Sequence, residues 1–169
     1  MKPPPLPAET LRRVIKIARL DGLSVIVVAG LSALLAAAMG DLVSAIVALL
    51  VTAAGCGEWH GAKLLRRRDI RGLDWLVRSQ LYLLSVILSY AITRLASYDP
   101  EYVRSLVTPE MNQIFQQAGM NLDDIMPLVR TAFYATYGTL AVVTLIYQGG
   151  LAFYYRRRAA IIHTALGGE

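Results

Sequence analysis

The sequence has little of what disulfide-linked, metal-binding or highly charged soluble domains depend on. It contains one cysteine and two histidines, and charged residues make up only 17% of its 169 residues. A single cysteine cannot form a disulfide within the chain, which excludes a small disulfide-stapled domain. Cys56 itself lies in an apolar run, where a thiol usually packs as a small hydrophobic group.

The motifs of common catalytic and cofactor sites are also missing. The sequence has no H-E-x-x-H, no Cys and His at metal-ligand spacing, no G-x-S-x-G and no phosphate-binding glycine loop. A haem between His60 and His163 is disfavoured, because His163 is expected to lie beyond the membrane. Adjacent Asp123 and Asp124 are more typical of a helix start than of a metal site. We therefore expect neither enzymatic activity nor a metal or other cofactor.

What the sequence has in abundance is apolar residues, which make up 56% of the chain and occur in blocks. A helix needs about 20 mostly apolar residues to cross a bilayer. Four segments meet this requirement and predict an all-α, polytopic integral membrane protein, in which the whole chain, 1–169, is a single membrane domain. The predicted transmembrane helices are residues 23–39, 42–64, 73–96 and 128–155.

The distribution of Lys and Arg predicts how these helices are oriented. Thirteen basic residues lie in the N-terminal segment, the second loop and the C-terminal tail, whereas three lie in or beside the third loop. Because basic residues near the ends of spans resist translocation, we expect both termini in the cytoplasm and the chain in the cell (inner) membrane. The three alanines 36–38 could also end a cleaved signal peptide, but the charged lead-in is long for one.

Two further helices are expected on the cytoplasmic side. Residues 8–20 carry apolar side chains on one face and basic side chains around it, which predicts an interfacial amphipathic helix among anionic lipid headgroups. It would serve either as a plain topology anchor or as a lipid sensor. Residues 156–166 contain neither Pro nor Gly and are expected to extend the fourth span as a helical stub.

The loop 97–127 is expected to be structured, extracytoplasmic and acidic. Asp99 and Thr108 each precede a proline, a pattern typical of an N-cap and the first helical residue, and Gly119 is typical of a helix end. Two short helices are therefore predicted. The loop carries a net charge of minus four, which predicts an acidic outer mouth formed by Asp99, Glu101, Glu110, Asp123 and Asp124.

Ionisable side chains at membrane depth are candidates for function, because they are costly to place there. Glu58 lies near the end of the second predicted span, and Arg78 lies near the start of the third. Antiparallel neighbouring helices would bring both to a similar depth. We therefore predict an intramembrane ion pair between Glu58 and Arg78, which serves either function or only the locking of two helices.

Polar residues on the third and fourth predicted spans recur at helical spacing and form one stripe on each helix. Such stripes predict either a wet path between the two helices or interhelical hydrogen bonds. The stripe residues are Asp74, Arg78, Tyr82, Ser85, Ser89 and Thr93 on the third span, and Arg130, Tyr134, Tyr137, Thr144 and Gln148 on the fourth.

The first two spans carry small residues at helical spacing instead, including Gly22 and Gly30 on the first and Gly55 on the second. Small residues allow helices to approach closely. Glu58 lies on the same face of the second span as Gly55, so we expect its carboxyl group to face a neighbouring helix rather than lipid.

Together these features favour a small oligomeric channel or transporter that prefers cations, with the third and fourth helices lining a polar path. The alternative is a non-transporting scaffold or regulatory subunit that acts through helix packing and a partner protein. The expected partners are anionic lipid headgroups, further copies of the chain and a small cation. Nucleic acid is not expected, because the basic runs are explained by membrane topology.

Overall fold

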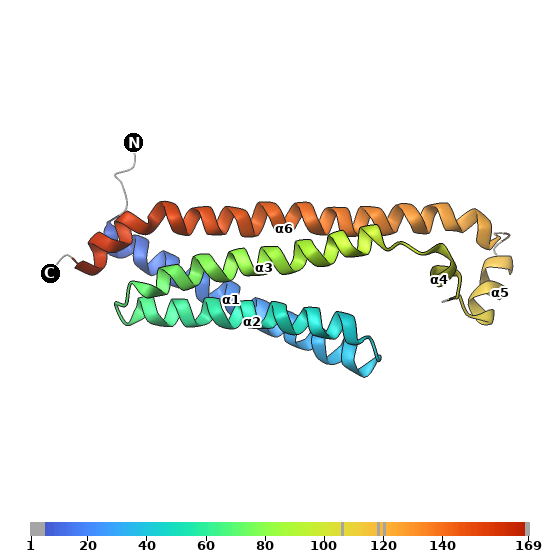
Figure 1. The fold of residues 1–169 in the computed structure, drawn as a ribbon, viewed down its shortest axis with the longest axis horizontal. Helices are drawn as coiled ribbons and strands as arrows, with labels where there is room; N and C mark the ends of the chain where they lie inside the picture. The colour runs from blue at the N-terminus through green and yellow to red at the C-terminus, as the bar shows by residue number, and fades with distance from the viewer. Residues whose placement is uncertain (1–5, 106, 118, 120, 168–169) are drawn as a thin grey trace. The chain divides into compact units, whose positions relative to one another are not determined.

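The computed structural model describes residues 6–105, 107–117, 119 and 121–167, and the regular elements among them are all helices (Figure 1). By length and composition, four of these helices are apolar enough to cross a membrane. This finding supports the prediction of an all-α membrane protein with several spans. The helices are α1 (Pro7–Ala38), α2 (Leu42–Arg66), α3 (Arg71–Ala96), α4 (Pro100–Ser105), α5 (Pro109–Gln117) and α6 (Leu122–Gly167).

Helix α1 joins two segments that the sequence analysis separates. It runs without a break for 32 residues and contains both the expected interfacial helix, 8–20, and the first span, 23–39, except for Met39, which caps its C-terminus. The buried residues Val14, Ala18 and Gly22 follow one another at four-residue steps, so one face continues through the expected boundary. The structure thus replaces a separate interfacial helix with the first turns of α1, whose apolar face packs against protein.

The turns between the first three helices are held by local interactions. Gly40 has a positive φ of 77°, which glycine adopts without strain, and the side chain of Asp41 caps α2 by accepting a hydrogen bond from the Ser44 backbone N–H at 3.0 Å. Between α2 and α3, the Arg71 guanidinium donates to the Asp69 carboxylate at 2.7 Å. This bond, together with one from the Arg71 backbone N–H to the same carboxylate, holds the pKa of Asp69 below its ordinary value.

The chain divides into two compact units, of which the first comprises Met1–Leu88 and Thr144–Glu169. Its core lies where α1 begins, α2 ends, α3 begins and α6 ends. It consists of Val14, Ala18, Ala62, Leu65, Leu73, Leu76, Tyr155 and Ile162. Large apolar side chains farther along α1 and α2 stay exposed, including Leu34 at 70% and Leu42 at 69%, as expected of helices that face lipid.

The second unit, Ser89–Val143, contains α4 and α5, which begin at the prolines that the sequence predicts. Asp99 Oδ1 accepts a hydrogen bond from the Glu101 backbone N–H at 2.9 Å, and Thr108 Oγ1 accepts one from Met111 at 3.3 Å. Gly119, just after α5, has a φ of 72°.

Helix α6 differs from the predicted fourth span at its start. It begins at Leu122, whereas the sequence analysis places a loop up to residue 127. Pro127 lies inside the helix, just past its first turn, so the helix lacks the backbone hydrogen bond that an N–H at this position would donate to the Asp123 carbonyl. The helix then continues through the predicted span and the predicted stub to Gly167.

Candidate functional site

The first unit buries two acidic side chains, Asp21 of α1 and Glu58 of α2, with relative exposures of 9% and 1%. Glycines bring the two helices together at this level. A Cβ atom added to Gly22 would lie 3.0 Å from the carbonyl oxygen of Gly55 and 3.4 Å from the Cβ of Glu58. The backbones of α1 and α2 are therefore in contact at the level of Asp21 and Glu58.

Side chains from α3 and α6 complete the site. Gln80 Nε2 donates a hydrogen bond to Asp21 Oδ2 at 3.3 Å, and the Tyr147 hydroxyl donates to Asp21 Oδ1 at 2.9 Å. The Tyr155 hydroxyl donates to Glu58 Oε1 at 2.9 Å. All four long helices thus contribute to this group of five residues, which we call the carboxylate cluster.

The carboxylate cluster has an excess of acceptors and no basic partner within the described part of the chain. The groups that donate to Asp21 and Glu58 are an amide and two hydroxyls, all neutral. A buried carboxylate without a counter-charge is costly, and neutral hydrogen bonds offset only part of that cost. A proton or a small cation at the site would balance the charge.

Two glutamine side chains add unused acceptors in the same unit. Gln80 and Gln148 have relative exposures of 1% and 7%, and the Oε1 atom of each is buried without a hydrogen-bond partner. Gln148 lies on the face of α6 that also carries Tyr155, two turns further on. Carboxylate and amide oxygens are ligands of hard cations. Groups of three or more His, Cys, Asp or Glu suited to a metal ion are absent from the described residues.

The predicted ion pair between Glu58 and Arg78 is not formed among the residues described. Glu58 is buried and hydrogen-bonded to Tyr155, whereas Arg78 is exposed. The buried face of α3 carries Leu76 and Gln80, and Arg78 lies two residues from each, on the opposite side of the helix. Similar depth along two helices did not ensure that the two side chains face each other.

The predicted polar stripe on α3 lies on the exposed side of that helix. All six of its residues, Asp74, Arg78, Tyr82, Ser85, Ser89 and Thr93, are exposed on the single chain. The Ser85 hydroxyl donates to the Leu81 carbonyl at 2.9 Å, and the Thr93 hydroxyl donates to the Ser89 carbonyl at 2.8 Å. These hydroxyls are satisfied within their own helix and need no water-filled path.

The predicted stripe on α6 is divided between different surroundings. Thr144 and Gln148 are buried in the first unit. Tyr137 is half-buried, and Arg130 and Tyr134 are exposed in the second unit, where the Arg130 guanidinium lies 5.8 Å from the Tyr134 ring centroid. Only the buried part of the stripe lies on the face that carries the carboxylate cluster.

The residues of the predicted acidic outer mouth, Asp99, Glu101, Glu110, Asp123 and Asp124, are all exposed. Some of them have local structural roles, since Asp99 caps α4 and Asp123 pairs with Arg104 at 2.7 Å. The second unit has a hollow of about 650 Å³, lined by Arg104 and Arg130 as well as Asp123. The lining of this hollow therefore carries both basic and acidic side chains, rather than acidic ones alone.

Of the five residues of the carboxylate cluster, the sequence predicts only Glu58 as a candidate within the membrane; it does not predict Asp21, Gln80, Tyr147 and Tyr155 as its neighbours. A signal for two of them was present. Gln80 lies in phase with the buried apolar residues of α3, and Asp21 lies beside Gly22 on the buried face of α1. A polar residue in the apolar phase of a helix is more informative than a polar stripe on the opposite face.

Comparison of the chain with protein-family models, curated proteins and solved structures finds no match.

Proposed function

We propose that the chain is a multi-pass membrane protein that binds and transports small cations, with the carboxylate cluster as the cation site. The observation that supports this proposal is a pair of buried carboxyl groups, Asp21 and Glu58, whose described hydrogen-bond partners are all neutral. Ionisable groups within membrane-spanning helices typically mark ion pathways and proton relays. We thus propose the carboxylate cluster as the cation site, in place of the polar path that the sequence predicts along the stripe of α3.

The donor atoms of the cluster define the class of cation. They are carboxylate, amide and hydroxyl oxygens, so the site suits a proton or an alkali cation rather than a metal that prefers nitrogen or sulfur ligands. Carbonyl-type oxygens can replace the hydration shell of an alkali ion. The unused Oε1 atom of Gln80 is available for this purpose.

The proposal includes assembly of several copies, because four spans rarely enclose a pore. Asp74 and Arg78 are exposed on a helix of spanning length, and charged side chains in a membrane typically face protein or water rather than lipid. A second copy of the chain would cover them. Cross-linking through a cysteine introduced at Tyr82, with one at the exposed Val142 of α6 as the control, would locate this contact.

The proposed orientation places both termini in the cytoplasm and α4 and α5 outside. We expect a membrane-impermeant thiol reagent to label a cysteine at Gln116 and to leave one at Arg67 protected. Cys56 is exposed and would first be replaced by alanine. The reverse labelling pattern would overturn the orientation and the outer position of the acidic loop.

The functional test is ion flux in liposomes under a KCl gradient. We expect a cation-selective reversal potential for the wild type and no flux for Asp21→Asn combined with Glu58→Gln. Neutralising Asp99, Glu101 and Glu110 together should reduce the preference for cations but leave flux intact, because surface charge acts through local ion concentration. Replacing K⁺ with Na⁺ or imposing a pH gradient identifies the cation.

A non-transporting scaffold is the second candidate function. It is favoured by the hydroxyls of Ser85 and Thr93, which donate to backbone carbonyls of α3. Because these hydroxyls already have partners, they do not require a water-filled path beside the helix. This function predicts no flux above that of empty liposomes with either cation or with a pH gradient.

A further inference from the structure

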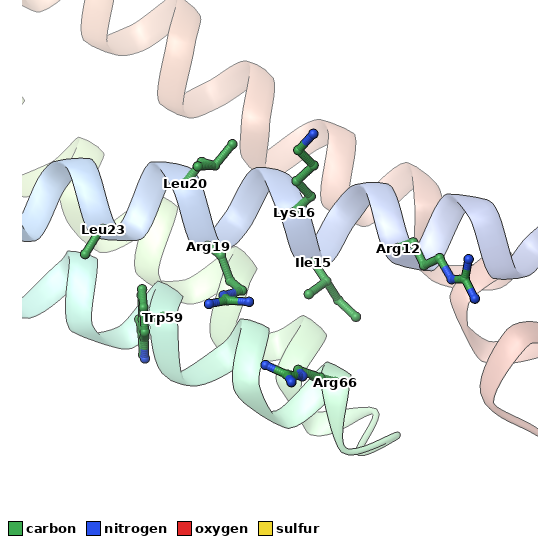
Figure 2. A pocket seen from close by; sticks show the side chains of 8 residues that line it. All are labelled: Arg12, Ile15, Lys16, Arg19, Leu20, Leu23, Trp59 and Arg66. Carbon is green, nitrogen blue, oxygen red and sulfur yellow. The ribbon is translucent and has the colours of Figure 1, made fainter.

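The first unit has a basic groove between α1 and α2, separate from the carboxylate cluster (Figure 2). Its volume is about 520 Å³. The basic residues that line it are Arg12, Lys16 and Arg19 of α1 and Arg66 of α2. Figure 2 shows Arg19 reaching from α1 toward α2, with Arg66 extending from α2 on the same side of α1. The lining contains four cationic side chains and no carboxylate.

The other residues that line the groove are apolar or aromatic. They are Ile15, Leu20 and Leu23 of α1 and Trp59 of α2. Arg12 and Leu23 are separated by about 16 Å along the axis of α1, given a rise of about 1.5 Å per residue. The groove therefore passes from the charged beginning of α1 to the first turn of its apolar run.

Trp59 and Arg19, which both line the groove, are in contact with each other. The Arg19 guanidinium lies 5.4 Å from the centroid of the Trp59 ring, within the range of a cation–π contact. A smaller adjoining hollow of about 240 Å³ is lined by the same two residues together with Lys63 and Arg66. Arginine forks match the geometry of phosphate oxygens, and tryptophan is typical of the membrane–water interface.

We propose that this groove binds a single anionic phospholipid. The phosphate and headgroup lie against Arg12, Lys16, Arg19 and Arg66, and the beginning of one acyl chain lies along Leu20 and Leu23. A free anion would use only the basic part of the groove, whereas an amphiphile uses both parts. The lipid would join α1 to α2 at the level where both helices leave the apolar layer.

Quenching of Trp59 fluorescence by brominated lipid provides a direct test. The other tryptophan, Trp75, would be replaced by phenylalanine so that Trp59 is the only reporter. The protein would be reconstituted in phosphatidylcholine vesicles that contain brominated phosphatidylglycerol, and in matched vesicles with brominated phosphatidylcholine. We expect quenching by the anionic lipid at low mole fractions, and much weaker quenching by the neutral lipid.

Arg19→Gln combined with Arg66→Gln should weaken the preference for the anionic lipid about thirtyfold, since each arginine would lose a direct hydrogen bond with the bound phosphate worth about 1 kcal/mol, and 1.4 kcal/mol is tenfold. The matched control is Arg156→Gln with Arg157→Gln, which removes two exposed charges of α6 away from the groove. This control should change the preference by less than about threefold. In the unchanged chain, added salt should reduce the preference, a measurement that does not depend on any variant.

Three results would overturn the proposal. Equal quenching by both lipids would show ordinary exposure of Trp59 to the bilayer. An equal loss of preference in the groove variant and in the α6 control would show a general charge effect. Full displacement of the brominated anionic lipid by inorganic phosphate would show a free-anion site rather than a lipid site.

Discussion

The packing of α2 against α3 predicts a large effect of one added methyl group at Gly61. A Cβ atom at this position would lie 2.8 Å from the carbonyl oxygen of Gly72 and 3.0 Å from the Cβ of Trp75. The opposing atoms include backbone, which cannot rotate away. Gly61→Ala must therefore push α3 away from α2 in the region of the core residues Leu65 and Leu76.

The magnitude of this effect follows from two opposing contributions. Alanine is favoured over glycine in a helix by about 1 kcal/mol, and overpacking a core costs about 1–3 kcal/mol. We therefore expect Gly61→Ala to lower the free energy of unfolding by up to about 2 kcal/mol. Gly57→Ala is the matched control on the same helix, because its nearest new neighbour would be the Cβ of Ser79 at 3.4 Å, an ordinary contact. The control should be neutral or stabilising by up to about 1 kcal/mol.

The assay is unfolding of the protein in mild-detergent micelles by increasing amounts of sodium dodecyl sulfate, followed by circular dichroism. The quantity of interest is the difference between the two alanine variants, which differ mainly in the contact with α3. Equal stability of Gly61→Ala and Gly57→Ala would refute the close contact between α2 and α3.

Two further predictions concern hydrogen bonds to acidic side chains. Tyr155→Phe removes the donor to the buried Glu58 and should destabilise the protein by about 1–3 kcal/mol in the same assay, whereas Tyr154→Phe, at the neighbouring half-buried ring, should have little effect. The pKa of Asp69 is lowered by its hydrogen bonds with Arg71, so this interaction is present at neutral pH and is lost as the pH falls through the lowered value; Arg71→Gln should raise the Asp69 pKa toward 3.8 in an NMR titration of its carboxyl carbon.

Much of the fold follows from local features of the sequence. Apolar runs of sufficient length predict the four long helices, and the residues before Pro100 and Pro109 predict the starts of α4 and α5. The sequence predicts less well where a helix begins or ends at the expected membrane surface. The break expected before residue 23 is absent because Gly22 packs on α2 and continues the buried face of α1.

The site was harder to predict than the fold, because it depends on which helix faces pack together. The small residues on its helix face predict that Glu58 faces a neighbouring helix, but similar depth in the membrane does not predict which side chain it meets, because that depends on the rotation of each helix about its axis. Arg78 lies on the exposed side of α3, whereas Gln80 lies on its buried face. Tyr147 and Tyr155 come from a helix remote in sequence, and periodicity within one helix contains no information about its distant neighbours.

The carboxylate cluster can be tested most directly by infrared difference spectroscopy of the protein reconstituted in lipid. The spectrum would be recorded as K⁺ is exchanged for Na⁺ and as the pH is lowered. We expect a change in carboxyl absorption that disappears in Asp21→Asn combined with Glu58→Gln and persists when the exposed Glu101 is changed to Gln. A spectrum that does not respond to any exchange, or one that responds equally in the double variant, would contradict a cation site at Asp21 and Glu58.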